Sequence, residues 1–333
     1  MSVTPFSPAS PIGRQTVAPP AAQEVASRGF AADMARALAA RPRSIAPKYF
    51  YDARGSQLFD AICELPEYYP TRTELAILRS HASEIARQIG PRAEIVEFGA
   101  GSCVKVGLLL DAMERPASYL PIDISGDHLA ASAAELRGRY PALDVQPLIA
   151  DYTQRLLLPA LSPGAGQRVG FFPGSTIGNF TPAEALHFLQ VTGQVLRGGA
   201  LLLGADLIKP PEILHAAYND AQGVTAAFNL NLLARANREL GTDFVPERFA
   251  HSAFYNAPEQ RIEMHLVSRC HQQVTMAGQA YEFDEGETLH TENSYKFTVG
   301  GLRSLAERAG FRAGPVWTDP HRMFCLHWLH APV

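Results

Sequence analysis

The chain has 333 residues, of which 47% are hydrophobic, so it is long enough for one large or two ordinary folded domains. Its 29 basic and 33 acidic residues give a net charge of −4, which offers no basic field for a polyanion, so we expect neither a nucleic-acid nor a membrane partner. The four cysteines stand far apart and lack metal-ligand spacing, which predicts reduced thiols in a cytoplasmic protein and no metal site.

The N-terminal 27 residues are rich in Pro, Ala and Ser. They contain neither the charged start and apolar core of a signal peptide nor the ~18 apolar residues of a membrane span. We therefore expect residues 1–27 to form a disordered tail.

From residue 71 to residue 207 the spacing of the apolar residues predicts helices and strands in alternation. Thr71 followed by Glu74 is typical of a capping box, and an apolar stripe continues from there, so a helix is expected over 71–89. Further helices are expected at 104–113, 129–139 and 182–196, and strands at 93–98, 119–122, 145–150, 169–172 and 200–204. This alternation predicts an α/β fold with a doubly wound, mostly parallel sheet.

The alternation stops after residue 207. A helical pattern covers 221–240 and a strand pattern covers 261–266, so residues 208–295 are predicted to form an inserted α+β domain. A helix over 299–309 then precedes two strands, at 313–317 and 323–329. This hairpin would complete a seven-stranded sheet, so residues 296–333 are expected to return to the first domain.

A glycine turn follows the strand predicted at 93–98. Gly99 and Gly101 break this strand, and glycines at such a place let the backbone approach a ligand closely. The third glycine of the dinucleotide fingerprint would fall at Val104, so a pyrophosphate is not the first expectation.

Acidic residues end the next two strands. Asp123 follows Gly99 at close to the ~20 residues expected for a carboxylate that binds ribose hydroxyls. Asp151 can accept a hydrogen bond from an adenine amino group, and Tyr152 can stack on the ring. The alternative for each Asp is to cap the following helix. Together these residues favour an adenosine ligand that carries no pyrophosphate.

Longer strings carry a family resemblance. They are Tyr51–Asp60, Leu65–Arg72, Gly174–Phe180, Ala227–Asn229, Ile262–Met264 and Thr291–Phe297. In order and spacing they resemble the histidine N-alpha-methyltransferases of ergothioneine biosynthesis, which are class I S-adenosylmethionine-dependent methyltransferases. The resemblance implies that residues 71–207 bind S-adenosylmethionine, that 208–295 recognise the substrate, and that 28–70 pack with this substrate domain.

The resemblance also implies site residues. Those that match the cofactor contacts of the family are Tyr51, Gly99, Lys105, Asp123, Asp151 and Tyr152. Those that match its histidine contacts are Tyr68, Gly174, Asn179, Tyr218, Met264, Glu292 and Ser294.

The residue types agree with these roles. Glu292 and Ser294 lie on the same side of an extended strand, where they could hold the two imidazole nitrogens, and Met264 could pack on the ring. The alternative for Glu292 is an exposed strand carboxylate. The sequence departs from the family pattern in two places: the glycine turn continues as Ser102-Cys103-Val104, which is more apolar than expected, and Asn293 replaces a small apolar residue.

The resemblance implies trimethylation of the α-amino group of L-histidine to its betaine, hercynine. The amine must lose a proton before each transfer, and Tyr51 or Tyr68 is a candidate proton relay. We expect a monomer. Three alternatives stay open. They are the same chemistry on another α-amino acid or histidine derivative, a Rossmann-type dehydrogenase, and a non-catalytic nucleotide-binding protein.

Overall fold

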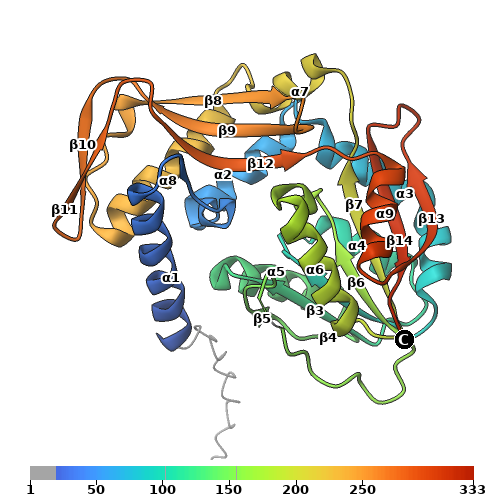
Figure 1. Ribbon diagram of the computed structural model, residues 1–333. Coiled ribbons are helices and arrows are strands. Elements are labelled where there is room, and N and C mark those ends of the chain that lie inside the picture. The colour runs from blue at the N-terminus through green and yellow to red at the C-terminus, as the bar shows by residue number, and fades with distance from the viewer. Residues whose placement is uncertain (1–19, 102, 155) are drawn as a thin grey trace, which may run out of the picture.

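The structure is a computed structural model that describes residues 20–101, 103–154 and 156–333 (Figure 1). Residues 1–19 of the predicted tail and Ser102 of the glycine turn lie outside the described residues. The tail prediction was wrong for residues 20–27, because helix α1 (Pro20–Ala39) already begins there.

A doubly wound sheet forms the larger part of the molecule (Figure 1). Its strands lie in the order β13 (Arg312–Thr318), β14 (Phe324–His330), β7 (Ala200–Asp206), β6 (Arg168–Phe172), β2 (Glu94–Phe98), β3 (Ser118–Asp123) and β4 (Asp144–Val145), and β5 (Leu148–Ile149) also pairs with β3. The strands from β2 to β7 run parallel, whereas β14 is antiparallel to β7 and β13 is antiparallel to β14. The predicted sheet with its terminal hairpin is therefore confirmed.

Helices cover both faces of this sheet. One apolar core lies under α3 (Tyr69–Ile89), α4 (Val104–Ala112) and α5 (Gly126–Arg139). The opposite core lies under α6 (Pro182–Val195) and α9 (Val299–Arg308). Both faces of the central strands are thus buried, as expected for continuous apolar strands with crossover helices.

The strand predicted at 145–150 is broken into β4 and β5. Pro147 lies between them and has no N–H to donate to the ladder, so each short piece pairs with β3 separately. The sheet therefore has eight strands within the described residues, not seven.

The capping box predicted at Thr71 was wrong. Helix α3 begins at Tyr69, with Pro70 in its first turn, and the Thr71 hydroxyl donates to the Cys63 sulfur at 3.2 Å. Glu74 turns into the protein and is fully buried. A true capping box stands at α6, where the Glu184 N–H donates to Thr181 and the Thr181 N–H donates to Glu184.

The inserted part begins after β7 and ends before α9. Leu207 and Phe297, at its two ends, form an isolated parallel β-bridge. A four-stranded sheet has the order β1 (Arg43–Ser44), β12 (Thr288–Tyr295), β9 (Arg261–Ser268) and β8 (Phe249–Asn256). The other elements here are α7 (Pro211–Tyr218), α8 (Val224–Leu240), the hairpin β10 (Gln272–Met276) and β11 (Gln279–Phe283), and the short 3-10 turn η3 (Pro246–Arg248).

The N-terminal segment shares a core with the inserted part. Phe30, Phe50 and Tyr69 lie in one apolar cluster with Phe228 and Leu289. Helix α2 (Ala53–Glu64) and the short turn η1 (Pro47–Phe50) pack against α8, and β1 adds a parallel strand to β12. Strand β12 is therefore held between early and late segments of the chain. Within the described residues, no helix is long and apolar enough to span a membrane.

One buried histidine in the sheet makes a stability prediction. His327 on β14 is fully buried, and neither of its ring nitrogens has a hydrogen-bond partner among residues 20–101, 103–154 and 156–333. Burial, aided by the charge of Arg303, lowers its pKa to about 4. Below its ordinary pKa of ~6.5 only the unfolded chain takes up this proton, so His327 is expected to cost about 2 kcal/mol of stability between pH 7 and pH 5.

His327→Leu should remove this loss, measured as the difference between urea unfolding free energies at pH 7 and pH 5. His187→Leu, at an exposed position on α6, is the control and should keep the wild-type pH dependence. An equal pH dependence in His327→Leu and wild type would contradict the assignment.

Candidate active site

The glycine turn at the end of β2 takes a backbone conformation that favours glycine. Gly99 has φ = 73°, and its N–H donates to the Ile122 carbonyl at 2.9 Å. A Cβ atom built on Gly99 would lie 3.3 Å from the Tyr152 hydroxyl. Gly99 therefore keeps the turn narrow beside Tyr152, which suits a ligand that lies against the backbone.

A Gly99→Ala variant should bind S-adenosylhomocysteine about tenfold more weakly by calorimetry, because a non-glycine residue in this conformation costs ~1–2 kcal/mol and the new methyl crowds Tyr152. Gly101→Ala is the matched control, since a Cβ there meets no atom within 4 Å. Equal affinities of the two variants would show that the turn does not contact the cofactor.

The two acidic strand ends lie next to this turn. Asp123 ends β3 and accepts from the Ser125 N–H at 2.8 Å. Asp151 accepts from the Thr153 N–H at 2.9 Å and pairs with Lys48 at 2.9 Å. Both carboxylates raise the pKa of Tyr152, although burial of this phenol is the larger cause. The structure thus brings Gly99, Asp123, Asp151 and Tyr152 together at one edge of the sheet.

Lys105 is held by a residue that the sequence assigned to a helix cap. The ammonium of Lys105 lies 2.6 Å from the Glu74 carboxylate, which is fully buried. Both Glu74 oxygens also accept from the Gly174 N–H, at 3.0 Å. Glu74 therefore links two predicted site residues, one for the cofactor and one for the substrate, that are far apart in the sequence.

Three tyrosines gather near Glu292. The rings of Tyr68 and Tyr218 are 6.4 Å apart, and Phe59 lies between Tyr68 and Tyr51, at 6.3 Å and 5.5 Å. Burial is the largest cause of the raised pKa of each tyrosine, and the charge of Glu292 adds to it in all three. These phenols stay protonated at neutral pH and can serve as hydrogen-bond donors.

Tyr51 also joins the two groups of predicted residues. Its pKa is raised by Tyr152 and Asp123 on the glycine-turn side as well as by Glu292, after burial. Tyr51 therefore lies close to residues at the glycine turn and to Glu292 on β12.

Glu292 and Ser294 point to the same face of β12. Glu292 pairs in register with Met264 on β9, and a bulge lies between His290 and Glu292. Glu292 is partly buried, and within the described part of the chain no side chain hydrogen-bonds to its carboxylate. Burial raises its pKa to about 7, against the opposing charge of Lys296. This carboxylate is the feature of the site best suited to accept an N–H group from a ligand.

Asn179 lies in the short turn η2 (Thr176–Asn179), which packs against β12. A Cβ atom at the neighbouring Gly178 would lie 2.8 Å from the Tyr295 carbonyl, so the turn and the strand are in close contact. Asn179 is half-buried, and its amide can donate to a carboxylate without adding charge.

Lys296 belongs to the same site and was not predicted. Its ammonium lies 2.7 Å from the Ser294 hydroxyl and 3.0 Å from Asp206 at the end of β7. Tyr218 and Asp206 raise the pKa of Lys296 even though burial alone would lower it. The only available signal was its position two residues after Ser294, because Asp206 and Tyr218 reach it from distant segments.

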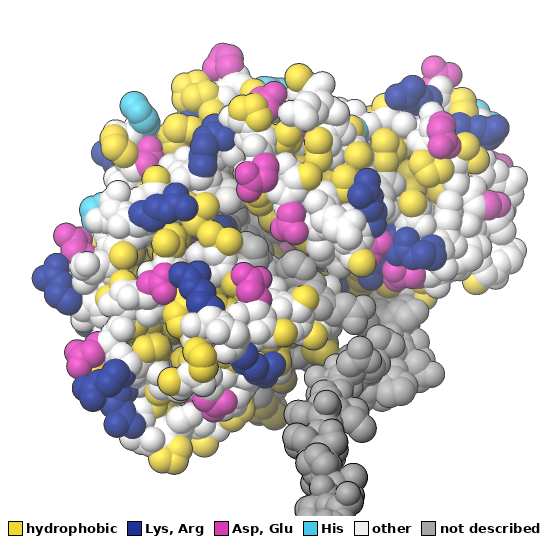
Figure 2. Space-filling view, turned by 180° about the vertical axis from the view of Figure 1, so that it is seen from behind, with side chains coloured by type: hydrophobic (Ala, Val, Ile, Leu, Met, Phe, Trp, Pro, Cys, Tyr) yellow, Lys and Arg dark blue, Asp and Glu magenta, His cyan; other side chains and the backbone are white. Residues whose placement is uncertain are grey.

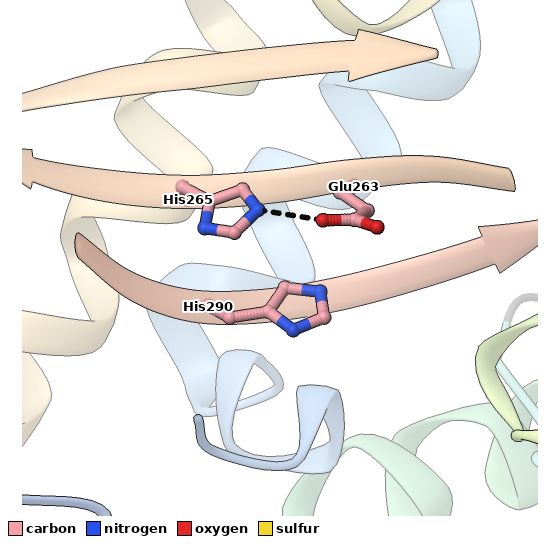
Figure 3. A group of neighbouring side chains, drawn as sticks. All are labelled: Glu263, His265 and His290. Carbon is pink, nitrogen blue, oxygen red and sulfur yellow. Dashed lines mark hydrogen bonds and ion pairs between the residues drawn. The ribbon is translucent and has the colours of Figure 1, made fainter. Parts of the chain in front are cut away.

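Three side chains of metal-binding type lie on the face of this sheet opposite to Met264. Ligand atoms of Glu263, His265 and His290 lie within 4.8 Å of one another, although no metal site was predicted (Figure 3). Arg261 also pairs with Glu263 at 2.7 Å, and the two imidazole rings stack with an interplanar angle of 16°. In-plane lone pairs of stacked rings do not converge on one point, so this geometry favours a hydrogen-bonded cluster.

Comparisons with known proteins agree with the predicted family. The family model for histidine-specific, S-adenosylmethionine-dependent methyltransferases matches residues 30–331. The chain is 42% identical to the histidine N-alpha-methyltransferase of Mycolicibacterium smegmatis, over 92% of this chain and 96% of that one. It is 32% identical to the ergothioneine biosynthesis protein 1 of Neurospora crassa, over 80% of this chain and 32% of that longer one.

A more distant relative is the 4-dimethylallyltryptophan N-methyltransferase of Claviceps purpurea, 26% identical over 85% of this chain and 90% of that one. The match to the family model spans the glycine turn, the strand-end acids and the inserted sheet with Glu292 and Ser294. With this match over most of its length, the chain belongs to the histidine-specific, S-adenosylmethionine-dependent methyltransferases, the family that its strings predict.

Proposed function

We propose that this protein transfers methyl groups from S-adenosylmethionine to the α-amino group of L-histidine, three times in succession, and so makes the betaine hercynine on the way to ergothioneine. The observation that carries the proposal is the pair Glu292 and Ser294 on one face of β12, beside Met264 and the tyrosine cluster. These two side chains, on one face of an extended strand, match the two nitrogens of an imidazole ring in number and can each hydrogen-bond to one of them.

The adenosyl ligand is proposed to lie along the glycine turn. Gly99, Lys105, Asp123, Asp151 and Tyr152 would hold it, with Tyr51 between it and the substrate. Asp151 Oδ1 already accepts from the Thr153 N–H and from the Thr153 hydroxyl, whereas Oδ2 accepts from Lys48, so Oδ2 has its second lone pair for a ligand. When bound, S-adenosylmethionine would supply an electrophilic methyl group on its sulfonium, with S-adenosylhomocysteine as the leaving group when the C–S bond breaks and an amine nitrogen takes the methyl.

The protein mainly has to orient the amine and leave it unprotonated. Asn179 and Tyr68 are proposed to bind the amino-acid carboxylate, with Gly174 and Tyr218 completing the pocket. The raised pKa of Tyr51 keeps its phenol protonated, so it can relay a proton only by releasing its own hydrogen as it accepts another. After the third transfer no amine proton remains, and the reaction stops.

A panel of amino acids with labelled S-adenosylmethionine tests the proposal. L-histidine should be methylated far faster than any other member, up to three labels per molecule. The panel should include tryptophan and 4-dimethylallyltryptophan, because of the distant relative with that acceptor. A preference for another amino acid would move the proposal to that acceptor. Calorimetry with S-adenosylhomocysteine and with NAD separates a methyltransferase, whether for histidine or for another amino acid, from a dehydrogenase, which would bind NAD.

We also propose that the protein acts as a monomer in the cytoplasm, without a nucleic-acid partner. One chain supplies both the adenosyl-side and the ring-side residues, and all four cysteines are free. Acidic and basic side chains are interspersed over the face seen in Figure 2, which gives no extended basic surface there. Light scattering on a sizing column should give the mass of one chain, 36.2 kDa, and a dimer would contradict this proposal.

A further inference from the structure

A buried lysine sets the hydrogen-bonding of Ser294. Lys296 is 3% exposed, and its ammonium donates to the Ser294 hydroxyl oxygen at 2.7 Å and to the Tyr218 hydroxyl oxygen at 3.3 Å. Tyr218 in turn donates to the Ser294 oxygen at 2.7 Å. A phenol is more acidic than an aliphatic hydroxyl and is the better donor of the two.

These contacts use all the acceptor capacity of Ser294. A hydroxyl oxygen has two lone pairs and one hydrogen, and an ammonium group can only donate. With one lone pair facing Lys296 and the other facing Tyr218, only the hydrogen of Ser294 remains for a ligand.

We infer that Lys296 makes Ser294 an obligate hydrogen-bond donor, so that the site accepts the imidazole of histidine only as a neutral ring in one tautomer. The unprotonated ring nitrogen then faces Ser294, and the ring N–H faces Glu292. An imidazolium ion has an N–H on both ring nitrogens, so it would place a donor opposite the Ser294 hydroxyl hydrogen, and no hydrogen bond could form there. This inference rests on the proposed function, because it assumes that histidine is the bound ligand.

The ion pair with Asp206 holds Lys296 in place. Asp206 is 1% exposed, lies 3.0 Å from the Lys296 ammonium, and also accepts from the Tyr69 hydroxyl at 2.5 Å. Because Asp206 ends β7 of the main sheet and Lys296 directly follows β12, the pair connects the ring-binding residues to the methyltransferase sheet. Lys296 is thus a positioning residue, since it acts on the ring through Ser294.

Nitrogen-15 NMR of ring-labelled L-histidine, bound to the protein together with S-adenosylhomocysteine, tests the inference directly. The bound ring should show one protonated and one unprotonated nitrogen in a single tautomer at pH 6 to 7, where free histidine is a mixture of charge states. Two protonated nitrogens in the wild-type complex would overturn the inference while leaving the proposed function intact. Failure of histidine to bind or to be methylated would overturn the proposed function itself.

Two lysine variants separate this role from a structural one. Lys296→Met should weaken histidine binding roughly tenfold or more, as a charge-assisted hydrogen bond is lost, raise KM more than it lowers kcat, and allow a doubly protonated ring in the NMR spectrum. Lys209→Met is the control, because Lys209 also pairs with Asp206, at 2.5 Å, and no hydrogen bond found within the described residues joins it to Ser294.

Lys209→Met should keep the wild-type tautomer and KM even if it loses comparable stability. If the two variants bind histidine with affinities within about twofold of each other and show the same ring tautomer, Lys296 is only a structural cation. The wild-type NMR result remains decisive if Lys296→Met does not fold.

Discussion

Glu292→Ala is expected to raise KM for L-histidine about a hundredfold while the affinity for S-adenosylhomocysteine stays within about twofold. The truncation leaves the ring N–H of histidine without its acceptor in a partly buried site, which costs more than the loss of an exposed contact. Steady-state kinetics with histidine and calorimetry with S-adenosylhomocysteine measure the two effects separately.

Asn293→Ala is the matched control for this variant. Asn293 is the next residue on β12 but pairs with Glu263 across the sheet, so its side chain points to the other face. It should keep the wild-type KM. An unchanged KM in Glu292→Ala would remove the proposed ring contact, and an equal rise in both variants would indicate a general disturbance of β12.

Glu292 is expected to make the stability of the folded protein depend on pH. Because burial raises the pKa of Glu292 to about 7, the folded protein holds this proton more tightly than the unfolded chain does. Its contribution to stability is full below the ordinary carboxyl pKa of ~4.3 and is lost as the pH rises through about 7. Glu292→Gln should therefore unfold at a higher temperature than wild type at pH 8 and lose histidine activity, measured by thermal scans and turnover.

Glu74→Met is expected to lower the free energy of unfolding by ~3–5 kcal/mol, because it leaves the Lys105 ammonium buried without its carboxylate. The Lys105 side chain is only 16% exposed and lies 2.6 Å from Glu74. The Gly174 N–H loses its acceptor in the same change. Urea unfolding at pH 7 measures the loss.

The double variant Glu74→Met, Lys105→Met separates stability from cofactor binding. It removes both charges, so it should recover most of the lost stability, apart from the part due to Gly174. It should still bind S-adenosylhomocysteine at least about tenfold more weakly than wild type, as Lys105 matches a cofactor contact of the family. Wild-type affinity in the double variant would show that Lys105 has a structural role only.

The sheet could be predicted from local patterns because each of its strands carries its own signal. Apolar runs that end in Gly99, Asp123 and Asp151 are readable within a few residues, and crossover helices follow them at regular spacing. The exception, at Pro147, was also local: a proline within the expected strand was a sign that the ladder would break there.

The roles of Glu74 and His327 could not be predicted in this way. Thr71 and Glu74 have the spacing of a capping box. Glu74 instead pairs with Lys105 and Gly174 in the interior, because leaving a buried ammonium unpaired costs far more free energy than losing a helix cap. Nothing in the sequence around His327 indicates that both its ring nitrogens are buried without a partner among the residues that the structure describes.

By itself the sequence determined the family, the fold class and the glycine turn, and it predicted the pair Glu292 and Ser294 as ring contacts, because these depend on residue type and spacing along one segment. Only the tertiary structure decided which charges these residues meet. Lys296 contacts Tyr218, Ser294 and Asp206, which come from α7, β12 and β7. A pKa and a hydrogen-bonding direction depend on burial and on such distant partners, and neither is a property of the local sequence.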